Sequence, residues 1–388
     1  MPMKKSPQTT LIHSEYAAPP GFDAFPVPIH HASTVLFKDV AAMRSGQWRD
    51  KSGYTYGLHG TPTTFTLEAR LAEIEGGLDC LLAPSGLAAI AMANLALLRS
   101  GDDLLMPDNV YSPSRELGSW LTRDFGITAR YYDPLAGADI AALIRPNTKL
   151  IWTEAPGSVT MEVPDLPAIC KVAHEKGIPV ALDNTWSAGL ALRGFDLGVD
   201  IVMQALTKYQ SGGSDVLMGA LITRERALHE RLALSHMRLG LGVSGDDSYL
   251  VLRGLPTMRM RFDAHDASAR KLAAWLKARP EIAKVLHPAF PDCPGHASWQ
   301  RDFHGAGGLF SVIFEARYSE AQTDRFVDAL ALFKIGYSWG GPGSLVMPYR
   351  LQNVRKNWTE AGQLVRLNVG LEETDDLIAD LEQALAQL

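Results

Sequence analysis

The sequence predicts an α/β fold with a mostly parallel sheet flanked by helices, followed by a smaller C-terminal α/β domain. Two observations carry this prediction. Between residues 67 and 204, compact apolar runs alternate with longer stretches of helical periodicity. Strands that are buried on both faces have such near-continuous apolar runs. Strands that alternate with helices indicate crossover units, and these build a parallel sheet.

The expected elements follow in order along the chain. Leu67, Leu71 and Ile74 recur at helical spacing, and Gly76 ends this first helix. The expected strands are 80–83, 103–106, 129–132, 150–153, 178–182, 201–204 and, later in the chain, 308–313. The expected helices between and after them are 87–99, 114–125, 166–176 and a long one at about 258–279.

Changes in this pattern divide the chain into three expected regions. Residues 1–58 are rich in Pro, Gly, His and aromatic residues without sustained periodicity, which is typical of an arm that packs on a neighbouring subunit. Residues 59–252 are expected to form the main domain, which binds the cofactor inferred below. The alternation breaks at Arg253–Pro256, so residues 253–388 are expected to form the C-terminal domain.

Composition excludes several classes of function. The 388 residues carry a formal net charge of −6 with scattered basic side chains, which argues against nucleic acid as a partner. The longest apolar stretch, 87–98, is too short to span a membrane, and the start has no apolar signal region, so a cytoplasmic protein is expected. The three cysteines include no C-x-x-C pair, and no H-E-x-x-H occurs, so neither a disulfide framework nor a metal site is expected.

Three positions directly after apolar runs carry groups that suit one cofactor. In open α/β sheets, ligands bind beyond the carboxyl ends of the strands. Asp183 and Lys208 each follow such a run, and Ser85-Gly86 opens a helix whose unpaired N–H groups suit a phosphate. Pyridoxal 5'-phosphate (PLP) needs a lysine for its aldehyde, a carboxylate for its ring nitrogen and donors for its phosphate. Each feature alone is weak, but their order along the chain is specific.

The chain resembles the Cys/Met-metabolism family of fold-type-I PLP-dependent enzymes, and within it the bacterial cystathionine β-lyase branch. The resemblance extends from Tyr54 to Leu381. The strings that carry it are Glu154-Ala-Pro-Gly-Ser-Val-Thr-Met-Glu-Val163, Asp183-Asn-Thr-Trp186, Thr207-Lys-Tyr209, Tyr337-Ser-Trp-Gly-Gly341 and Leu364-Val-Arg-Leu-Asn-Val-Gly-Leu-Glu372.

The resemblance implies a role for each matching residue. It implies that Lys208 bonds to the cofactor and moves protons, that Asp183 pairs with the ring nitrogen, and that the Tyr111 ring stacks on the cofactor. Arg366 is implied to take the substrate carboxylate as a bidentate pair, which suits a planar guanidinium. The remaining implied residues are Gly86, Leu87 and Thr207 at the phosphate, Tyr56 at the phosphate of a neighbouring subunit's cofactor, and Tyr337, Ser338 and Trp339 around the substrate.

Two positions depart from the family pattern. Many members carry Tyr-x-Arg, with the arginine on the phosphate, whereas this chain has Leu58 at the third position. The resemblance also implies that position 59, usually basic, and an acidic residue at position 116 meet the distal end of cystathionine. Here these residues are His59 and Glu116, and a histidine is only partly charged near neutral pH. The sequence therefore also allows shorter sulfur amino acids as substrates.

The expected activity is α,β-elimination from cystathionine or a related sulfur amino acid such as cystine or a cysteine S-conjugate, as in methionine biosynthesis. The products would be pyruvate, ammonia and a thiol such as homocysteine, and the family implies a homotetramer built as a dimer of dimers. A γ-lyase or γ-synthase of the same family is the main alternative, and a non-catalytic PLP-binding protein is another. A nicotinamide-dependent dehydrogenase is excluded because no G-x-G-x-x-G follows the first strand.

Overall fold

The computed structural model describes residues 7–13, 20–21, 24, 26–46, 48, 51–351, 355 and 358–388, so part of the predicted arm lies outside the described residues. The α-helices are α1 (Pro7–Ile12), α2 (Val40–Ser45), α3 (Pro62–Glu75), α4 (Gly86–Leu97), α5 (Ser112–Phe125), α6 (Leu166–Glu175), α7 (Arg226–Leu239), α8 (Gly245–Lys277), α9 (His296–Asp302), α10 (Glu320–Ala329) and α11 (Thr374–Leu385). Short 3-10 turns lie at Gly57–His59, Gly137–Leu143 and Gly194–Leu197.

Two sheets organise the chain. The strands of the first are β1 (Asp79–Ala83), β2 (Asp103–Pro107), β3 (Thr128–Tyr132), β4 (Thr148–Glu154), β5 (Val180–Asp183), β6 (Ile201–Ala205) and β7 (Gly219–Thr223). Those of the second are β8 (Ile282–Leu286), β9 (Leu309–Phe314), β10 (Lys334–Ile335), β11 (Leu345–Tyr349) and β12 (Leu364–Asn368). All seven expected strands are present within two residues of their expected ends, and the predicted α/β class is confirmed.

The first sheet has the order β1-β7-β6-β5-β4-β2-β3. The neighbours among β2 to β6 are parallel, so their carboxyl ends lie at one edge of the sheet. Strand β7, which is not among the expected strands, lies antiparallel between β1 and β6. Apart from β3, which is partly exposed at the edge of the sheet, the strands are mostly buried. The apolar helix α4 packs against the sheet through Ala89, Met92 and Ala93.

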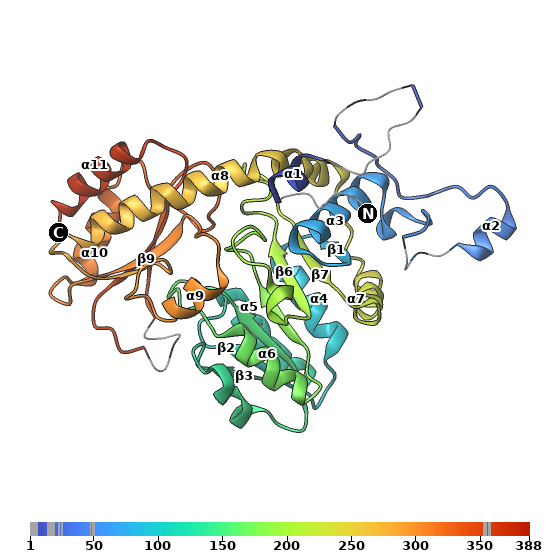
Figure 1. Ribbon diagram of the computed structural model, residues 1–388, viewed down its shortest axis with the longest axis horizontal. Coiled ribbons are helices and arrows are strands. Elements are labelled where there is room, and N and C mark those ends of the chain that lie inside the picture. Colours follow the sequence, from blue (N-terminus) through green and yellow to red (C-terminus); the bar gives the residue numbers. More distant parts are fainter. Residues whose placement is uncertain are drawn as a thin grey trace.

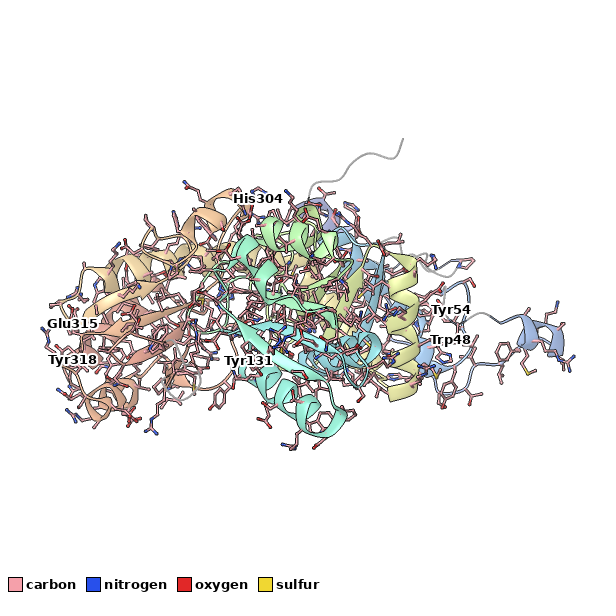
Figure 2. The ribbon with its side chains drawn as sticks, turned by 90° about the horizontal axis from the view of Figure 1, so that it is seen from below. Trp48, Tyr54, Tyr131, His304, Glu315 and Tyr318 are labelled. Atoms are coloured by element: carbon pink, nitrogen blue, oxygen red, sulfur yellow. The ribbon has the colours of Figure 1, made fainter. Side chains whose placement is uncertain are left out.

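The second sheet, β10-β11-β12-β9-β8, is mostly antiparallel and packs against α8, α10 and α11. Figure 1 shows α8 running from the first sheet to the second, with α2 at one end of the molecule and α11 at the other. In the turned view of Figure 2, Trp48 and Tyr54 again lie at the arm end, whereas Glu315 and Tyr318 lie at the far end. None of the helices in the described ranges is both long and apolar enough to cross a membrane.

The long helix α8 starts at Gly245, thirteen residues before its expected start at 258, and continues through Pro256. Proline removes one backbone donor from a helix interior, which is why the pattern suggested a later start. Arg261 bonds to the carbonyl of Gly254 with its Nη2 at 2.8 Å. A Cβ on Gly254 would lie 2.2 Å from the carbonyl oxygen of Gln210, so this glycine lets α8 pack directly on the chain that follows Lys208.

Candidate active site

A cleft of about 320 Å³ opens at the carboxyl ends of β4, β5 and β6, between the two sheets. This is the place where open α/β sheets bind ligands. Nine of the residues singled out from the sequence line it: Gly86, Leu87, Tyr111, Asp183, Thr207, Lys208, Tyr337, Ser338 and Trp339. The fold therefore brings residues from segments far apart along the chain to one cleft.

Lys208 lies in the turn after β6, with its side chain directed toward the second sheet. Its Nζ donates to the Ser338 Oγ at 2.7 Å and lies 5.1 Å from the centre of a Trp339 ring. Burial lowers the pKa of Lys208 to about 8, and the charge of Arg366 contributes to the lowering, against the opposing charge of Asp183. Near neutral pH the lysine therefore has an appreciable fraction of neutral, nucleophilic amine.

The turn that carries Lys208 is held from two sides. Arg261 of α8 donates from its Nη1 to the Tyr209 carbonyl at 2.8 Å. The Tyr209 side chain is fully buried, and its hydroxyl accepts from the Gly308 N–H at 2.7 Å. Because both contacts anchor the residue next to Lys208, they fix the direction in which the lysine leaves the sheet.

Asp183 ends β5, and its partly buried carboxylate accepts hydrogen bonds from a neighbouring residue. Its Oδ1 accepts from the Thr185 backbone N–H at 3.1 Å and from the Thr185 hydroxyl at 2.6 Å. The same hydroxyl oxygen accepts from the Ala205 N–H at 3.0 Å, which ties β5 to β6. Burial raises the pKa of Asp183 to about 6, although Thr185 and Lys208 lower it. The carboxylate is thus mostly ionised at neutral pH.

A buried polar cluster lies behind Asp183. Glu75 at the end of α3 accepts from Asn184 Nδ2 at 3.1 and 3.2 Å, and from Gln204 Nε2. Burial raises the pKa of Glu75 to about 7, against the lowering effect of these two amides. Because Asn184 follows Asp183 and Gln204 lies in β6, the cluster links α3 to the two strands that carry the site.

The start of α4 forms a cradle of backbone donors. The Ser85 hydroxyl caps the helix by accepting from the Ala88 N–H at 3.0 Å, and the first N–H groups of a helix have no partner within it. A Cβ on Gly86 would lie 2.9 Å from the Cβ of Ala205, and one on Gly219 would lie 2.4 Å from the Ser85 carbonyl oxygen. The two glycines therefore let the helix start lie directly against β6 and β7, where Thr207 faces the same cleft.

Tyr111 lies at the N-terminus of α5 and covers one wall of the cleft. Its backbone N–H donates to Glu154 Oε2 at 2.8 Å, and its side chain is 42% exposed. Burial and the charges of Asp183 and Glu154 raise the pKa of Tyr111, so its hydroxyl stays protonated. The partly exposed ring, on a backbone fixed by Glu154, is suited to stack on a planar ligand.

Arg366 of β12 is not among the residues that line this cleft, but it lies next to it, in contact with Ser338 of the lining. Its side chain is buried, and its Nη2 lies 3.5 Å from the Ser338 carbonyl oxygen, while Lys208 bonds to the hydroxyl of the same serine. Ser338 has a φ of 105°, a backbone conformation that residues with side chains rarely adopt. The next glycine, Gly340, donates to Asn368 Oδ1 at 3.0 Å, which holds this loop on β12.

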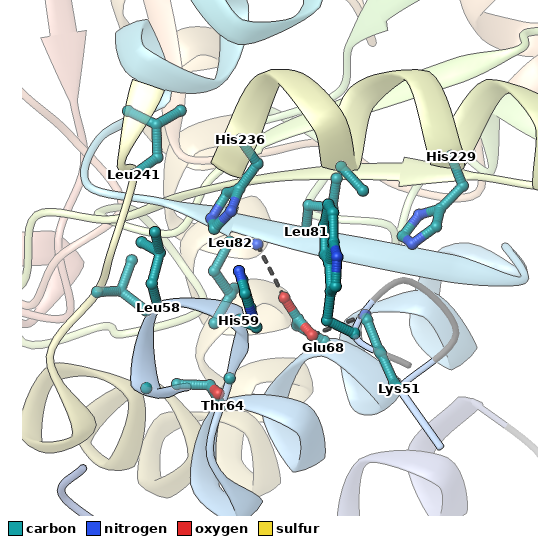
Figure 3. A pocket seen from close by; sticks show the side chains of 15 residues that line it. Lys51, Leu58, His59, Thr64, Glu68, Leu81, Leu82, His229, His236 and Leu241 are labelled. Atoms are coloured by element: carbon teal, nitrogen blue, oxygen red, sulfur yellow. Dashed lines mark hydrogen bonds and ion pairs between the residues drawn. The ribbon is translucent and has the colours of Figure 1, made fainter. Parts of the chain in front are cut away.

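Tyr56, His59 and Glu116 lie outside this cleft in their own chain. Tyr56 is 47% exposed, and Glu116 lies on the exposed face of α5. His59 points into a second pocket between the arm, α3 and α7 (Figure 3), where its Nδ1 lies 2.9 Å from the Thr55 hydroxyl and its ring stacks on Trp48 at 4.8 Å. Burial lowers the pKa of His59. The expected roles of these three residues stay predictions, and that of Tyr56 requires a neighbouring subunit.

Sequence reasoning gave no role to two residues of the site. Glu154 appears within a quoted string, but only the pairing of β4 with β5 places it beside Asp183. Thr185 follows Asp183 by two residues, the spacing at which an aspartate commonly bonds to the backbone of its own turn. That spacing could have identified Thr185, whereas the place of Glu154 depends on the order of the strands.

The residues of the cleft fit PLP. The start of α4 lines the cleft with Ser85, Gly86 and Leu87, and its first N–H groups are donors suited to a phosphate. Asp183 offers a partly buried carboxylate for a protonated ring nitrogen, and Lys208 offers an amine of lowered pKa for an aldehyde.

Comparisons with known proteins agree with this chemistry. A family model described as Cys/Met metabolism PLP-dependent enzyme matches residues 8–386. A putative cystathionine β-lyase of Rhizobium johnstonii is 44% identical over 364 residues, 92% of this chain and 90% of that protein. Cystathionine β-lyase MetC of Escherichia coli is 39% identical, with 93% of each chain covered. The crystal structure of cystathionine γ-synthase from Xanthomonas oryzae pv. oryzae has a TM-score of 0.90 and 29% identity over 99% of both chains. The chain belongs to the Cys/Met metabolism family of PLP-dependent enzymes.

Proposed function

We propose that the protein is a carbon–sulfur β-lyase that converts cystathionine, or a related amino acid such as cystine or a cysteine S-conjugate, to pyruvate, ammonia and a thiol. One observation carries the proposal: Ser338 contacts both Lys208 and Arg366, so an amine of lowered pKa lies next to the guanidinium suited to an amino-acid carboxylate. The β-lyase names of the two relatives support the choice of reaction.

In this proposal the cleft holds PLP through residues of the first sheet. The N–H groups of Gly86 and Leu87 and the Thr207 hydroxyl bind the phosphate, Asp183 pairs with the ring nitrogen, and the Tyr111 ring stacks on the cofactor. Bound PLP supplies an electron-withdrawing ring that stabilises negative charge at the substrate Cα. Asp183 is suited to this task because it stays ionised above about pH 6.

Residues of both sheets then act on the substrate. Arg366 binds the carboxylate as a bidentate pair, and Tyr337, Ser338 and Trp339 line the pocket around it. The Lys208 Nζ removes the Cα proton and delivers a proton to the departing sulfur, and the hydroxyls of Tyr111 and of the partner's Tyr56 assist this transfer. The hydroxyl of Ser338 accepts from the Lys208 Nζ, which directs this nitrogen toward the side of the cleft that Arg366 occupies.

Product analysis tests this function. The purified protein is incubated with cystathionine, cystine and cysteine S-conjugates, and the keto acid formed is identified. Pyruvate is the expected product, with Lys208→Ala as the inactive control. Formation of 2-oxobutyrate instead would favour a γ-lyase. Formation of cystathionine from an activated homoserine and cysteine would favour a γ-synthase, the activity in the name of the Xanthomonas structure.

We further propose that the protein is a homotetramer, a dimer of dimers, in which Tyr56 reaches the site of a neighbouring subunit. Tyr56 is exposed in its own chain, as are Leu36 and Val40 of the arm, which would become covered in an assembly. Light scattering tests the mass. Mixed refolding of Tyr56→Ala with Lys208→Ala tests the sharing, because only a hybrid dimer contains one complete site. If the mixture gains no activity, Tyr56 acts within its own chain or not at all.

The same reasoning supports a cytoplasmic location and, with cystathionine as substrate, a place in methionine biosynthesis, because homocysteine is then the thiol released. Cys80, Cys170 and Cys293 are buried and unpaired, which suits a reducing compartment. Fractionation of the cells that produce the protein tests the location. Rescue of a β-lyase-deficient strain that requires methionine tests the pathway.

A further inference from the structure

Two carboxyl groups lie side by side on the floor of the cleft. Glu154 ends β4, Asp183 ends β5, and the two are partners in the register of these parallel strands. Neighbouring strands lie about 4.8 Å apart, and partners in a parallel pair point to the same face. Both residues line the cleft, and Glu154 is only 8% exposed. Two carboxyl groups this close, one buried and one partly buried, do not both carry a charge without a large energetic cost.

The neighbours of the pair decide which group carries the charge. Asp183 accepts two hydrogen bonds from Thr185 and faces the positive Lys208, and both effects favour its ionised form. Glu154 accepts from the N–H of Tyr111 and interacts with Ser158, which also favour ionisation. Burial and the adjacent charge of Asp183 outweigh these bonds and raise the pKa of Glu154 well above its usual range. The proton therefore belongs on Glu154.

We propose that Glu154 is a positioning residue that acts in its neutral form: it holds the backbone of Tyr111 at the cleft wall and leaves the single negative charge of the floor on Asp183. This inference rests on the proposed roles of Asp183 and Tyr111 toward the cofactor. It does not depend on which sulfur amino acid is cleaved.

Replacing the carboxyl group by an amide at each of the two positions in turn tests the proposal. Glu154→Gln keeps a neutral side chain with an acceptor oxygen, so cofactor affinity and turnover at neutral pH should stay within about threefold of the parent. Asp183→Asn is the matched control that removes the charge, and turnover should fall on the order of a hundredfold or more. If Glu154→Gln is as damaging as Asp183→Asn, Glu154 must be charged and the proposal is wrong.

A spectroscopic titration shows, independently of turnover, whether Asp183 or Glu154 carries the negative charge. The visible absorbance of the bound cofactor is followed from acid to neutral pH. In the parent and in Glu154→Gln, a transition should be present at acid pH, where the carboxylate of Asp183 takes up a proton and loses its pairing with the ring nitrogen. It should vanish in Asp183→Asn. Loss of the transition in Glu154→Gln, with its retention in Asp183→Asn, would place the titrating charge on Glu154 and overturn the proposal.

The contact with Tyr111 is tested by Glu154→Leu, which has no acceptor. A buried N–H left without a partner should weaken cofactor binding by about 5- to 150-fold and reduce the circular dichroism that the protein induces in the cofactor band. Far-ultraviolet circular dichroism checks that Glu154→Leu folds. If it does not fold, the comparison of Glu154→Gln with Asp183→Asn still tests the proposal. A leucine variant with parental affinity and induced signal would refute the positioning role. Absence of pyruvate from the parent would instead count against the proposed function alone.

Discussion

The lowered pKa of Lys208 leads to a quantitative prediction about how fast the protein captures its cofactor. With a pKa of about 8, about 9% of the lysine is neutral at pH 7. With the ordinary value of 10.5, the neutral fraction would be about 0.03%, so the cleft raises the reactive amine about 300-fold. The rate of bond formation between Lys208 and PLP should therefore rise about tenfold per pH unit below pH 7 and level off above about pH 8.

The rate is measured by stopped-flow absorbance after PLP is mixed with protein from which the cofactor has been removed. The same reaction of PLP with free lysine in solution shows how far the pH dependence comes from PLP itself. Arg366→Leu should move the midpoint upward, because the charge of Arg366 contributes to the lowered pKa of Lys208. Arg317→Ala, which removes an exposed arginine, is the matched control and should leave the midpoint unchanged. A midpoint near 10.5 in the parent, or no movement in Arg366→Leu, would refute the electrostatic reasoning.

Three other perturbations have expected outcomes. Asp183→Ala should leave the visible band of the Lys208-bound cofactor but lower kcat on the order of a hundredfold or more, and full activity would contradict the role of Asp183. Arg366→Leu should lower kcat/KM by about 10- to 150-fold, since charge-assisted bonds contribute about 1.5–3 kcal/mol, and unchanged steady-state kinetics would exclude Arg366 as the carboxylate site. The folded state raises the pKa of Glu75, so this group makes folding less favourable as the pH rises from its usual pKa through about 7. Urea unfolding at about pH 5 and pH 8 should show that Glu75→Gln loses about 2 to 3 kcal/mol less stability over this range than the parent, and equal losses would contradict the raised pKa.

The regular part of the fold was predictable because buried parallel strands and their helices have simple sequence patterns. The failures have local causes. Pro256 suggested a helix boundary, yet α8 passes through it, and Gly254 seats this helix against the turn after Lys208. The antiparallel β7 lies between β1 and β6, an order that no local pattern reports.

The site was predictable to the extent that each group follows its own strand or helix start. Asp183, Lys208 and Gly86 could be singled out in this way, whereas Arg366 and Ser338 required the family resemblance. The contact of Ser338 with Lys208 joins residues 130 positions apart, and the pairing of Glu154 with Asp183 depends on strand order. The place of His59 against Trp48 likewise reflects tertiary packing, which no spacing in the sequence encodes.

The division of the site between two sheets has a consequence for the order in which the enzyme matures during synthesis. Gly86, Asp183 and Lys208 emerge from the ribosome well before Arg366, which lies close to the end of the chain. Domains commonly fold as units from the N-terminal side while synthesis continues. The nascent chain would thus contain its cofactor-binding groups before its carboxylate-binding group. A polypeptide that terminates before β12 would retain the means to hold PLP but would lack Arg366 for its substrate.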